Sequence, residues 1–460
     1  MEQSAPCFVW FRQDLRLSYN PALDAAIKTG RPLVCVYLWD PSSSYHPNPR
    51  QKQWIASSLR ELDIQLRERK NRLVFLKGDF ERLKQLICSK GCKDIFWNKR
   101  YTPSCLKEDE AIEQQFKQHG IAVHAYNSFL LNEPWEIKTI QGGFYQKFSP
   151  YAAAVLKKGF SFKGFGQLGY MFSYIKNIES DAIQDWHKEL GSPDWTGFVP
   201  GERAAQKQLD VFMQNHLLGY SLKRDFPGED ATSHLSIYLH HGEISIQQVI
   251  ERLEQTDVPE IDRICFIKEL LWREFNYQLL YQFPLLKIKS FNKLFEKFPW
   301  KYDQKQFLAW VEGRTGYPLV DAGMNQLRLT GFIHNRVRMV TASFLTKHLG
   351  LDWTWGENWF YKHLLDADEA NNAANWQWVA GSGADAAPFF RVFNPLLQAK
   401  KFDPNGTYIR QYITERRFVD ASLVHLQASP QWAYSGCTAP LVEHEKARLE
   451  ALLKYQRLKK

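Results

Sequence analysis

The chain has 460 residues, of which 44 % are hydrophobic and 24 % charged, and its net charge at pH 7 is +9. This length predicts two or three domains, each large enough to bury a core. No apolar stretch approaches the roughly 20 residues of a membrane span, and no basic leader precedes an apolar segment. The seven cysteines are scattered without a C-x-x-C pair, which argues against a disulfide framework, a metal site or an iron–sulfur centre. We therefore expect a reduced, cytoplasmic protein with no membrane partner.

Short apolar runs alternate with amphipathic segments over residues 1–130. The runs are rich in β-branched and aromatic residues, as buried strands are, and the segments between them have helical spacing. This alternation predicts a doubly wound parallel sheet, whose ligands bind beyond the carboxyl ends of the strands. The expected strands are Cys7–Phe11, Leu33–Leu38, Leu73–Leu76, Asp94–Trp97 and Ile121–Ala125, and the expected helices are Pro21–Thr29, Gln51–Lys70, Phe80–Ser89 and Ser104–His119.

Residues 131–200 lose this periodicity and accumulate glycine, proline, serine and aromatic residues, which indicates a long connection between domains. Within it, Gly164, Gly166 and Gly169 formally match the dinucleotide motif G-x-G-x-x-G. That motif binds a pyrophosphate only when it follows a strand and opens a helix. The preceding Tyr151–Lys158 has a helical composition instead, so we interpret the match as coincidental and do not expect a nicotinamide-dependent dehydrogenase.

From residue 201 to the end the pattern is helical, with glycine and proline as punctuation. The expected fold class is therefore α/β plus all-α: an α/β domain over residues 1–130, a linker over 131–200 and a helical domain over 201–460. The clearest expected helices are Ala204–Leu217, Ser245–Gln255, Ile261–Tyr281, Tyr317–Thr330, Asn335–Leu349 and Val442–Arg457.

Five of the sixteen tryptophans lie between residues 353 and 378, among several carboxylates and asparagines. A helical domain with an aromatic core would explain this run, and so would a planar ligand, a stacked base or an electron path. The positive net charge together with the aromatic content favours a polyanionic partner, because Lys and Arg neutralise phosphates while flat side chains stack on bases.

Several polar motifs follow one another along the chain. Trp10-Phe-Arg-Gln-Asp-Leu-Arg16 lies at the end of the first expected strand, where its charged side chains either cap a turn or bind a ligand. The hydroxyls of Thr232, Ser233 and Ser236 either cap a helix or face a diphosphate. Further on, Glu269, Trp272 and Arg273 share one helical turn. The last two motifs are the segments His334-Asn-Arg-Val-Arg-Met339 and Trp376-Gln-Trp378.

In this order, the motifs resemble those of the DNA photolyase/cryptochrome flavoprotein family over nearly the whole chain. Within that family the sequence is most similar to the class I cyclobutane pyrimidine dimer photolyases. The (6-4) photolyases usually carry paired histidines where this chain has His334-Asn335, and plant cryptochromes usually lack the tryptophan found here at Trp378. The resemblance implies a light-driven carbon–carbon lyase, in which excited reduced FAD gives an electron to a flipped-out dimer in UV-damaged DNA.

The resemblance also implies how the helical domain holds FAD. The diphosphate contacts the segment from Thr232 to Ser236, Arg338 pairs with Asp366 against the flavin ring, and Asn372 faces the flavin N5. At two positions this chain departs from the common family residues, with His234 in place of arginine and Phe266 in place of tryptophan. The expected cofactor-binding residues are Tyr220, Thr232, Ser233, His234, Leu235, Ser236, Glu269, Arg273, Arg338, Asp366, Asp368 and Asn372.

Other positions are expected, by the same resemblance, to face the lesion, the DNA strand or an electron path. The expected catalytic residues are Glu269, Trp272, Asn335, Met339, Asn372 and Trp378. The expected DNA-binding residues are Arg224, Trp272, Asn335, Arg336, Arg391 and Gln398. Trp376, Trp353 and Trp300 match the chain that photoreduces oxidised flavin, whereas Trp310, Trp355 and Trp359 are interpreted as core packing.

Three points stay open at this stage. Relatives carry a second, antenna chromophore, either a folate or a deazaflavin; Ser104-Cys105 stands where folate-binding relatives have Asn-Glu, which weakens the folate assignment without favouring the other. A cryptochrome-type photoreceptor without repair activity is the alternative function, although we expect no signalling tail after the last helix. A generic nucleic-acid-binding protein would explain the charge but not the carboxylates and amides among the tryptophans. We expect a monomer.

Overall fold

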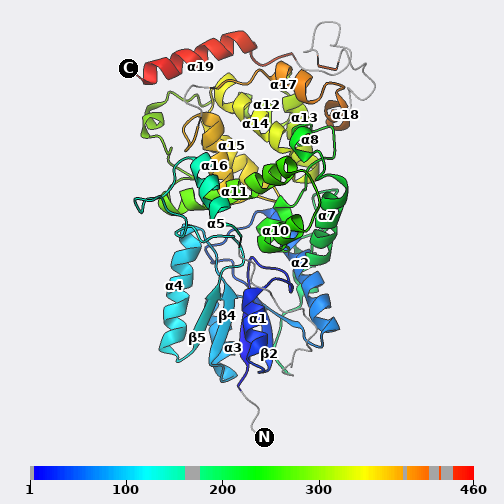
Figure 1. Cartoon of the computed structure of the whole chain (residues 1–460), viewed down its shortest axis with the longest axis vertical. Coiled ribbons are helices and arrows are strands. Elements are labelled where there is room, and N and C mark those ends of the chain that lie inside the picture. The colour runs from blue at the N-terminus through cyan, green and yellow to red at the C-terminus, as the bar shows by residue number, and fades with distance from the viewer. Residues whose placement is uncertain (1–4, 161–176, 387–390, 414–423, 426–438, 460) are drawn as a thin grey trace.

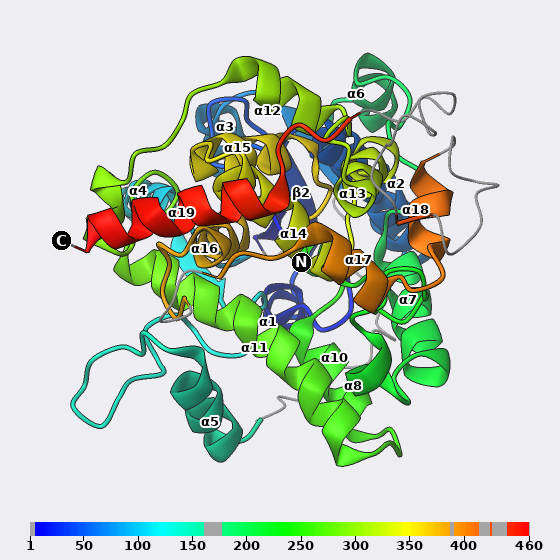
Figure 2. The same cartoon turned by 90° about the horizontal axis from the view of Figure 1, so that it is seen from above.

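The computed structural model describes residues 5–160, 177–386, 391–413, 424–425 and 439–459. A sheet with its flanking helices forms one end of the molecule, and a helical region forms the rest (Figure 1). Helix α19, His444–Leu458, lies across the end farthest from the sheet, as the view from above shows (Figure 2). The motif Gly164–Gly169 lies outside the described residues.

The sheet has five parallel strands in the order β3-β2-β1-β4-β5. Their bounds are Cys7–Phe11 (β1), Leu33–Trp39 (β2), Leu73–Lys77 (β3), Asp94–Asn98 (β4) and Ala122–Tyr126 (β5). Alternate side chains of β1 enter different cores: Cys7, Val9 and Phe11 face one layer, and Phe8 and Trp10 face the other. Because both faces are covered, the central strands read as continuous apolar runs. The predicted doubly wound sheet is confirmed.

Two helical layers cover the two faces of the sheet. Helices α1 (Pro21–Lys28) and α2 (Pro49–Glu68) pack on one face, and α3 (Phe80–Ser89) and α4 (Pro103–Gln118) pack on the other. Helix α2 begins with a capping box, in which Asn48 and Gln51 exchange side-chain and backbone hydrogen bonds. Such a cap satisfies N–H groups that have no partner within the helix.

The helical region contains all six helices expected from the sequence. Asn335–Leu349, expected as one helix, is an α-helix that continues into a π-helical turn, η2, at Phe344–His348. The bounds are Glu202–Asn215 (α7), Tyr220–Lys223 (α8), Ser236–His241 (α9), Ile246–Glu254 (α10), Glu260–Gln282 (α11), Lys293–Lys297 (η1, 3-10), Gln304–Val311 (α12), Pro318–Thr330 (α13), Asn335–Ser343 (α14), Trp353–His363 (α15), Glu369–Ala380 (α16), Pro395–Phe402 (α17) and Thr407–Tyr412 (α18).

The described parts of the connection pack with different neighbours. Helix α5, Phe148–Lys158, joins the core of the helical region, and the carboxylate of Glu274 accepts the backbone N–H groups of Leu131 and Asn132. Helix α6, Ile183–Glu189, packs on the sheet.

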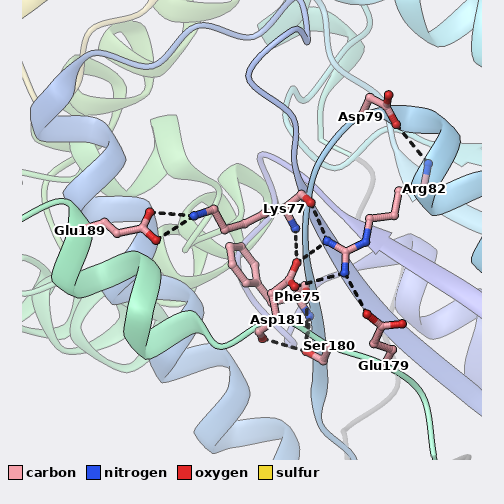
Figure 3. A network of polar contacts seen from close by, with 8 residues as sticks. All are labelled: Phe75, Lys77, Asp79, Arg82, Glu179, Ser180, Asp181 and Glu189. Carbon is pink, nitrogen blue, oxygen red and sulfur yellow. Dashed lines mark hydrogen bonds and ion pairs between the residues drawn. The ribbon is translucent and has the colours of Figure 1, made fainter.

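Asp181, which precedes α6, ties the connection to the edge strand β3. Its carboxylate accepts from the backbone N–H of Lys77 at 2.6 Å and from the guanidinium of Arg82 at 2.5 Å (Figure 3). Its own N–H donates to the carbonyl of Phe75 at 2.8 Å. These contacts occupy backbone groups that an edge strand would otherwise leave unpaired.

Arg16 joins the sheet domain to the helical region. Its buried guanidinium donates to the carbonyl oxygens of Tyr19 (2.9 Å), Ser128 (3.0 Å) and Gly242 (2.8 Å). Gly242 has φ +66°, and a Cβ there would lie 2.6 Å from the Cα of Asp14. The close approach of the two domains therefore requires glycine at this position.

Glu243 is fully buried beside this contact. Its Oε1 accepts from the indole N–H of Trp54 at 3.0 Å and from the N–H of Gly201 at 2.7 Å. Burial raises the pKa of Glu243 to about 8, although the hydrogen bonds partly oppose this. At pH values above the pKa of a carboxyl group in the unfolded chain and below this raised value, Glu243 is protonated in the folded state and ionised in the unfolded state. The stability that the neutral carboxyl contributes is therefore lost as the pH rises through that window.

We predict that Glu243→Gln, which cannot titrate, becomes more stable relative to the parent protein as the pH rises from about 5 to about 8, by up to a few kcal/mol. Urea unfolding at several pH values measures this. Glu254→Gln, on an exposed side chain of α10, makes the same chemical change at the surface and should show no such trend. A constant difference for Glu243→Gln would contradict the prediction.

Gly356 allows α15 and α16 to pack closely. A Cβ at this position would lie 2.5 Å from the Cζ3 of Trp376 and 2.6 Å from the Cδ2 of Leu345. Trp376 is buried there, with ring contacts to Phe360 at 5.0 Å and to Trp310 at 6.2 Å. The indole of Trp376 thus occupies the space that any other residue at position 356 would need.

We predict that Gly356→Ala destabilises the protein by about 1–3 kcal/mol, because overpacking outweighs the gain of up to about 1 kcal/mol from replacing a helical glycine. Chemical denaturation gives the free energy, and near-ultraviolet circular dichroism reports the displaced indole. Gly143→Ala is the control, because the nearest atom to its Cβ would be the Thr139 Oγ1 at an ordinary 3.5 Å. Equal stability of the two variants would refute the packing argument.

Candidate active site

A cavity of about 500 Å³ opens in the helical region, a volume typical of small-molecule and cofactor sites. Residues from α8, α9, α11, α14 and α16 and from the segments before α9 and α16 line it. Every residue expected to bind the cofactor lines it, as do all six expected catalytic residues and the DNA-binding candidates Arg224 and Arg336. Arg391, Gln398, Trp300 and Trp353 do not line it.

The hydroxyl-bearing segment before α9 forms one wall. His234 within it has a left-handed backbone, φ +52°, and its Nε2 lies 2.9 Å from the carboxylate of Asp230. The ring of His234 contacts that of Phe332 at 5.2 Å. The Oγ of Ser236 donates to Asp366 at 2.7 Å, which connects this wall to the next.

Arg338 and Asp366 form an ion pair of 2.8 Å at the cavity wall. The Nε of Arg338 also donates to the carbonyl of Ile333 at 2.7 Å, so its guanidinium is held in place. The other carboxylate oxygen of Asp366, Oδ1, is buried and has no partner among the described residues.

Asp368 caps α16 and joins it to α11. Its Oδ1 accepts from the backbone N–H and the side-chain amide of Asn371, each at 2.8 Å, and its Oδ2 accepts from the hydroxyl of Tyr277. Nδ1 of His240 lies 3.6 Å from Oδ2. Burial works against ionisation, but the His240 and Tyr277 interactions outweigh it and lower the pKa of Asp368 to about 2. The carboxylate is therefore charged across the physiological range.

Arg273 places a second cation against the cavity. Its Nη1 donates to the carbonyl of Phe129 at 2.9 Å, and its guanidinium lies 4.1 Å from the centre of that ring. Its Nη2 is buried without a partner among the described residues. A polar ligand in the cavity would satisfy this donor.

The lining of the cavity also carries paired charges and two large indoles. Arg224 forms an ion pair with Glu269, and Arg336 pairs with Asp225 at 2.5 Å. The indole of Trp272 stacks on Phe148 of α5, with ring centres 3.7 Å apart.

Trp378 forms part of the cavity wall, and the guanidinium of Arg391 lies 5.9 Å from the centre of its ring. The lining residue Asn335 is exposed and Met339 is half-buried. Arg391 thus adjoins the cavity through Trp378 although it does not line it.

The three indoles expected to form an electron path differ in their surroundings. Trp376 lines the cavity, Trp353 is buried and Trp300 is half-buried at its contact with Phe298, 4.3 Å between ring centres. Trp310, interpreted from the sequence as core packing, contacts Trp376 and donates its N–H to the carbonyl of Thr341 at 3.1 Å.

The residues of the cavity fit FAD. Unpartnered buried atoms on Arg273, Asp366 and His234 offer donors and an acceptor, and the hydroxyls of the segment before α9 offer more. The aromatic and aliphatic lining suits a flat ring system.

A second, much smaller cavity of about 50 Å³ lies in the sheet domain, beyond the carboxyl ends of the strands. Trp10, Arg12 and Tyr45 are among its lining residues. Arg12 is already paired with Asp109 at 2.6 Å. This volume is far below the roughly 300 Å³ of the smaller ligand sites, so the cavity as it stands does not fit a folate or a deazaflavin.

Sequence reasoning missed His240, Asn276 and Glu357. His240 accepts from the amide of Gln51 at 2.9 Å, and Asn276 donates to Asn371 at 2.9 Å. Glu357 is a buried acid bonded to Asn372. Their sequence surroundings carry no special pattern, because each acts through partners that are far away in the chain.

Neither a metal site nor a membrane span is found in the described part of the chain. No group of three or more His, Cys, Asp or Glu side chains there could hold a metal ion. None of the helices described is both long and apolar enough to traverse a bilayer.

Comparison with known proteins gives matches over the whole chain. Residues 7–164 match the family described as DNA photolyase, and residues 266–457 match the family described as FAD binding domain of DNA photolyase. A deoxyribodipyrimidine photo-lyase of Agrobacterium fabrum is 41 % identical, with 100 % of this chain and 99 % of that protein aligned. Cryptochrome-1 of Arabidopsis thaliana is 33 % identical over 97 % of this chain and 70 % of that protein.

A crystal structure of a bacterial class III photolyase from Agrobacterium tumefaciens superposes with a TM-score of 0.93 at 41 % identity, covering 100 % of this chain and 98 % of that one. The class I assignment made from the sequence therefore stays a prediction. The matches in sequence and in structure agree with the motifs at the cavity: the chain belongs to the DNA photolyase/cryptochrome family and carries its FAD-binding domain.

Proposed function

We propose that the protein is a deoxyribodipyrimidine photo-lyase that repairs cyclobutane pyrimidine dimers in UV-damaged DNA in the light. The observation that carries this proposal is one cavity lined both by the candidates for flavin contact and by the expected lesion-facing residues Glu269, Trp272, Asn335, Met339 and Trp378. When bound, reduced FAD supplies the light-absorbing group and the electron for the dimer. The protein binds the flavin, receives the flipped bases and keeps them beside it.

The chemistry of these lining residues supports the roles that we propose for them. Trp272 and Trp378 offer flat walls on which flipped bases stack, and the stack of Trp272 on Phe148 keeps that indole in one orientation. Glu269 and Asn335 offer hydrogen-bonding groups to the base edges. Arg224 and Arg336, together with Arg391 and Gln398, which do not line the cavity, are proposed to contact the strand, which positions DNA without reading its sequence.

The domain limits 1–130, 131–200 and 201–460, a cytoplasmic location and a monomeric state belong to the same proposal. A second, antenna chromophore, either a folate or a deazaflavin, also belongs to the proposal. A cryptochrome-type photoreceptor without repair is the alternative, supported by the identity with Cryptochrome-1.

The decisive experiment is an illumination assay on the purified protein. Its absorption spectrum is recorded, the flavin is reduced without oxygen, and oligothymidylate containing cyclobutane dimers is added under blue or near-ultraviolet light. Recovery of thymine absorbance only in the light would support the photolyase. Bound flavin without recovery would favour the photoreceptor, and absence of flavin would contradict both.

We predict that Glu269→Ala lowers the preference for dimer-containing over undamaged DNA by about 10-fold to 100-fold, the value of one or two hydrogen bonds to a charged group. Binding to undamaged DNA should not weaken, because the ion pair with Arg224 is lost and that guanidinium becomes available to phosphate. Titrations with both DNAs at fixed salt measure this. Glu260→Ala, on an exposed side chain of α11, is the control, and an unchanged preference in Glu269→Ala would eliminate this role.

We predict that Trp376→Phe abolishes photoreduction of oxidised flavin but leaves repair by pre-reduced enzyme largely intact. A phenyl ring fills much of the same space but is far harder to oxidise than an indole. Flavin absorbance under light with an external reductant measures the first property, and the dimer assay measures the second. Trp359→Phe is the control, since Trp359 stacks on His363 at 3.8 Å and does not line the cavity. Photoreduction at the parent rate in Trp376→Phe would disprove the proposed path.

A further inference from the structure

We propose that Glu357 is a positioning residue of the flavin site: it fixes the amide of Asn372 with its oxygen toward the cavity, and it takes up a proton when negative charge is added to the cavity. This inference rests on the proposed function, since it concerns the flavin of that cavity.

The orientation of the Asn372 amide follows from its two acceptors. Its Nδ2 lies 2.9 Å from the backbone oxygen of Glu357 and 2.9 Å from Oε1 of the same residue. These bonds use both amide hydrogens, whereas the reverse orientation would set Oδ1 against two oxygens. Asn372 lines the cavity, and the hydrogen bonds of its side chain to described residues are both made by Nδ2, with none at Oδ1. The acceptor of this amide is therefore available to a donor within the cavity.

The surroundings of Glu357 allow its carboxyl group to be either ionised or protonated. It is fully buried in α15, and its Oε2 has no partner among the described residues. Burial raises the pKa of Glu357 to about 7, while Lys287 and the Asn372 hydrogen bond act in the opposite direction and Glu369 reinforces the rise. These are the charged and polar groups that act on it.

The two parts of the inference are separable. The backbone oxygen of Glu357 accepts from Asn372 whatever the charge of the carboxyl group, and Oε1 accepts in both states when the proton is on Oε2. The amide orientation therefore survives protonation, and only the charge behind it changes. Because a second buried negative charge is unfavourable, an electron that enters the flavin favours the neutral carboxylic acid.

The proton balance of this step is simple. The electron comes from the reductant used in a titration, such as dithionite. The proton comes from solvent and forms an O–H bond at the carboxylate of Glu357. The reduction potential of the flavin should therefore depend on pH through Glu357.

The test of the coupling compares the flavin reduction potential with pH, from about 5.5 to about 8.5, in FAD-bound parent protein, Glu357→Gln and Glu369→Gln. The parent should show a change of slope near neutrality that Glu357→Gln lacks. Above that point Glu357→Gln should have the higher potential, because a neutral amide has replaced a negative charge. Glu369→Gln is the matched control: Glu369 lies nearby on α16 and is only half-buried, and this variant should keep the change of slope.

The test of the positioning uses Glu357→Leu, which removes one acceptor of the Asn372 amide. Reduced flavin in this variant should be oxidised by air several-fold faster than in the parent, and Glu357→Gln, which keeps an acceptor oxygen, should restore the slower rate. This rescue separates positioning of the amide from a general loss of packing.

The proton coupling and the positioning of the amide are tested by different variants. A parent-like change of slope in Glu357→Gln would overturn the proton coupling, and parent-like air oxidation in Glu357→Leu would overturn the positioning. If Glu357→Leu does not fold, the titration of Glu357→Gln still decides whether the inference stands. Bound flavin without dimer repair would overturn the proposed function alone, whereas a purified protein without flavin would overturn both.

Discussion

The N-terminal cap of α16 determines the geometry of the cavity. Asp368 holds the first turn through Asn371 and is itself held by Tyr277 of α11. From that fixed start, one helix presents Asn372, Trp376 and Trp378 to the cavity, the first two a single turn apart. A displaced cap would move all of these side chains together, so the proposed flavin and lesion contacts share one short helix.

Charge compensation is the second constraint on this site. The cavity contains several cations, yet Arg338, Arg224 and Arg336 each have a carboxylate partner. Leaving any of them unpaired in a partly buried wall would cost more than the pair gains from mutual attraction. Under the proposed function, a DNA phosphate that reaches these arginines would therefore exchange with a carboxylate instead of meeting an unpaired cation.

Local patterns in the sequence account for most of the fold. The alternation of Phe8 and Trp10 with Cys7 and Val9 places β1 between two apolar layers, and no distant contact is needed to infer this. The expected helices likewise rest on spacing and on punctuation by glycine and proline. Family resemblance, and not a local sequence pattern, predicted which motif residues line the cavity. No local pattern distinguishes Trp376, which lines the cavity, from Trp359, which does not. Their individual roles stay predictions.

The sequence could not predict contacts between residues that are far apart in the chain. The pairing of Arg224 with Glu269 joins two residues that were assigned to different partners. The connection was expected to be a linker, yet its described parts pack with different domains, because Trp186 meets the sheet and Phe148 meets Trp272. In its sequence context Glu357 does not differ from other glutamates in helices, and only the structure shows its contact with Asn372.

The buried acids have a consequence for how this protein folds. Burial raises the pKa values of Glu243 to about 8 and of Glu274 and Glu357 to about 7, while an unfolded chain would hold these groups ionised at neutral pH. At that pH these three groups therefore bind hydrogen ions from the medium when the chain folds. The heat of unfolding measured by calorimetry will then include the ionisation heat of the buffer, and values from phosphate and Tris solutions will differ even where the free energies agree.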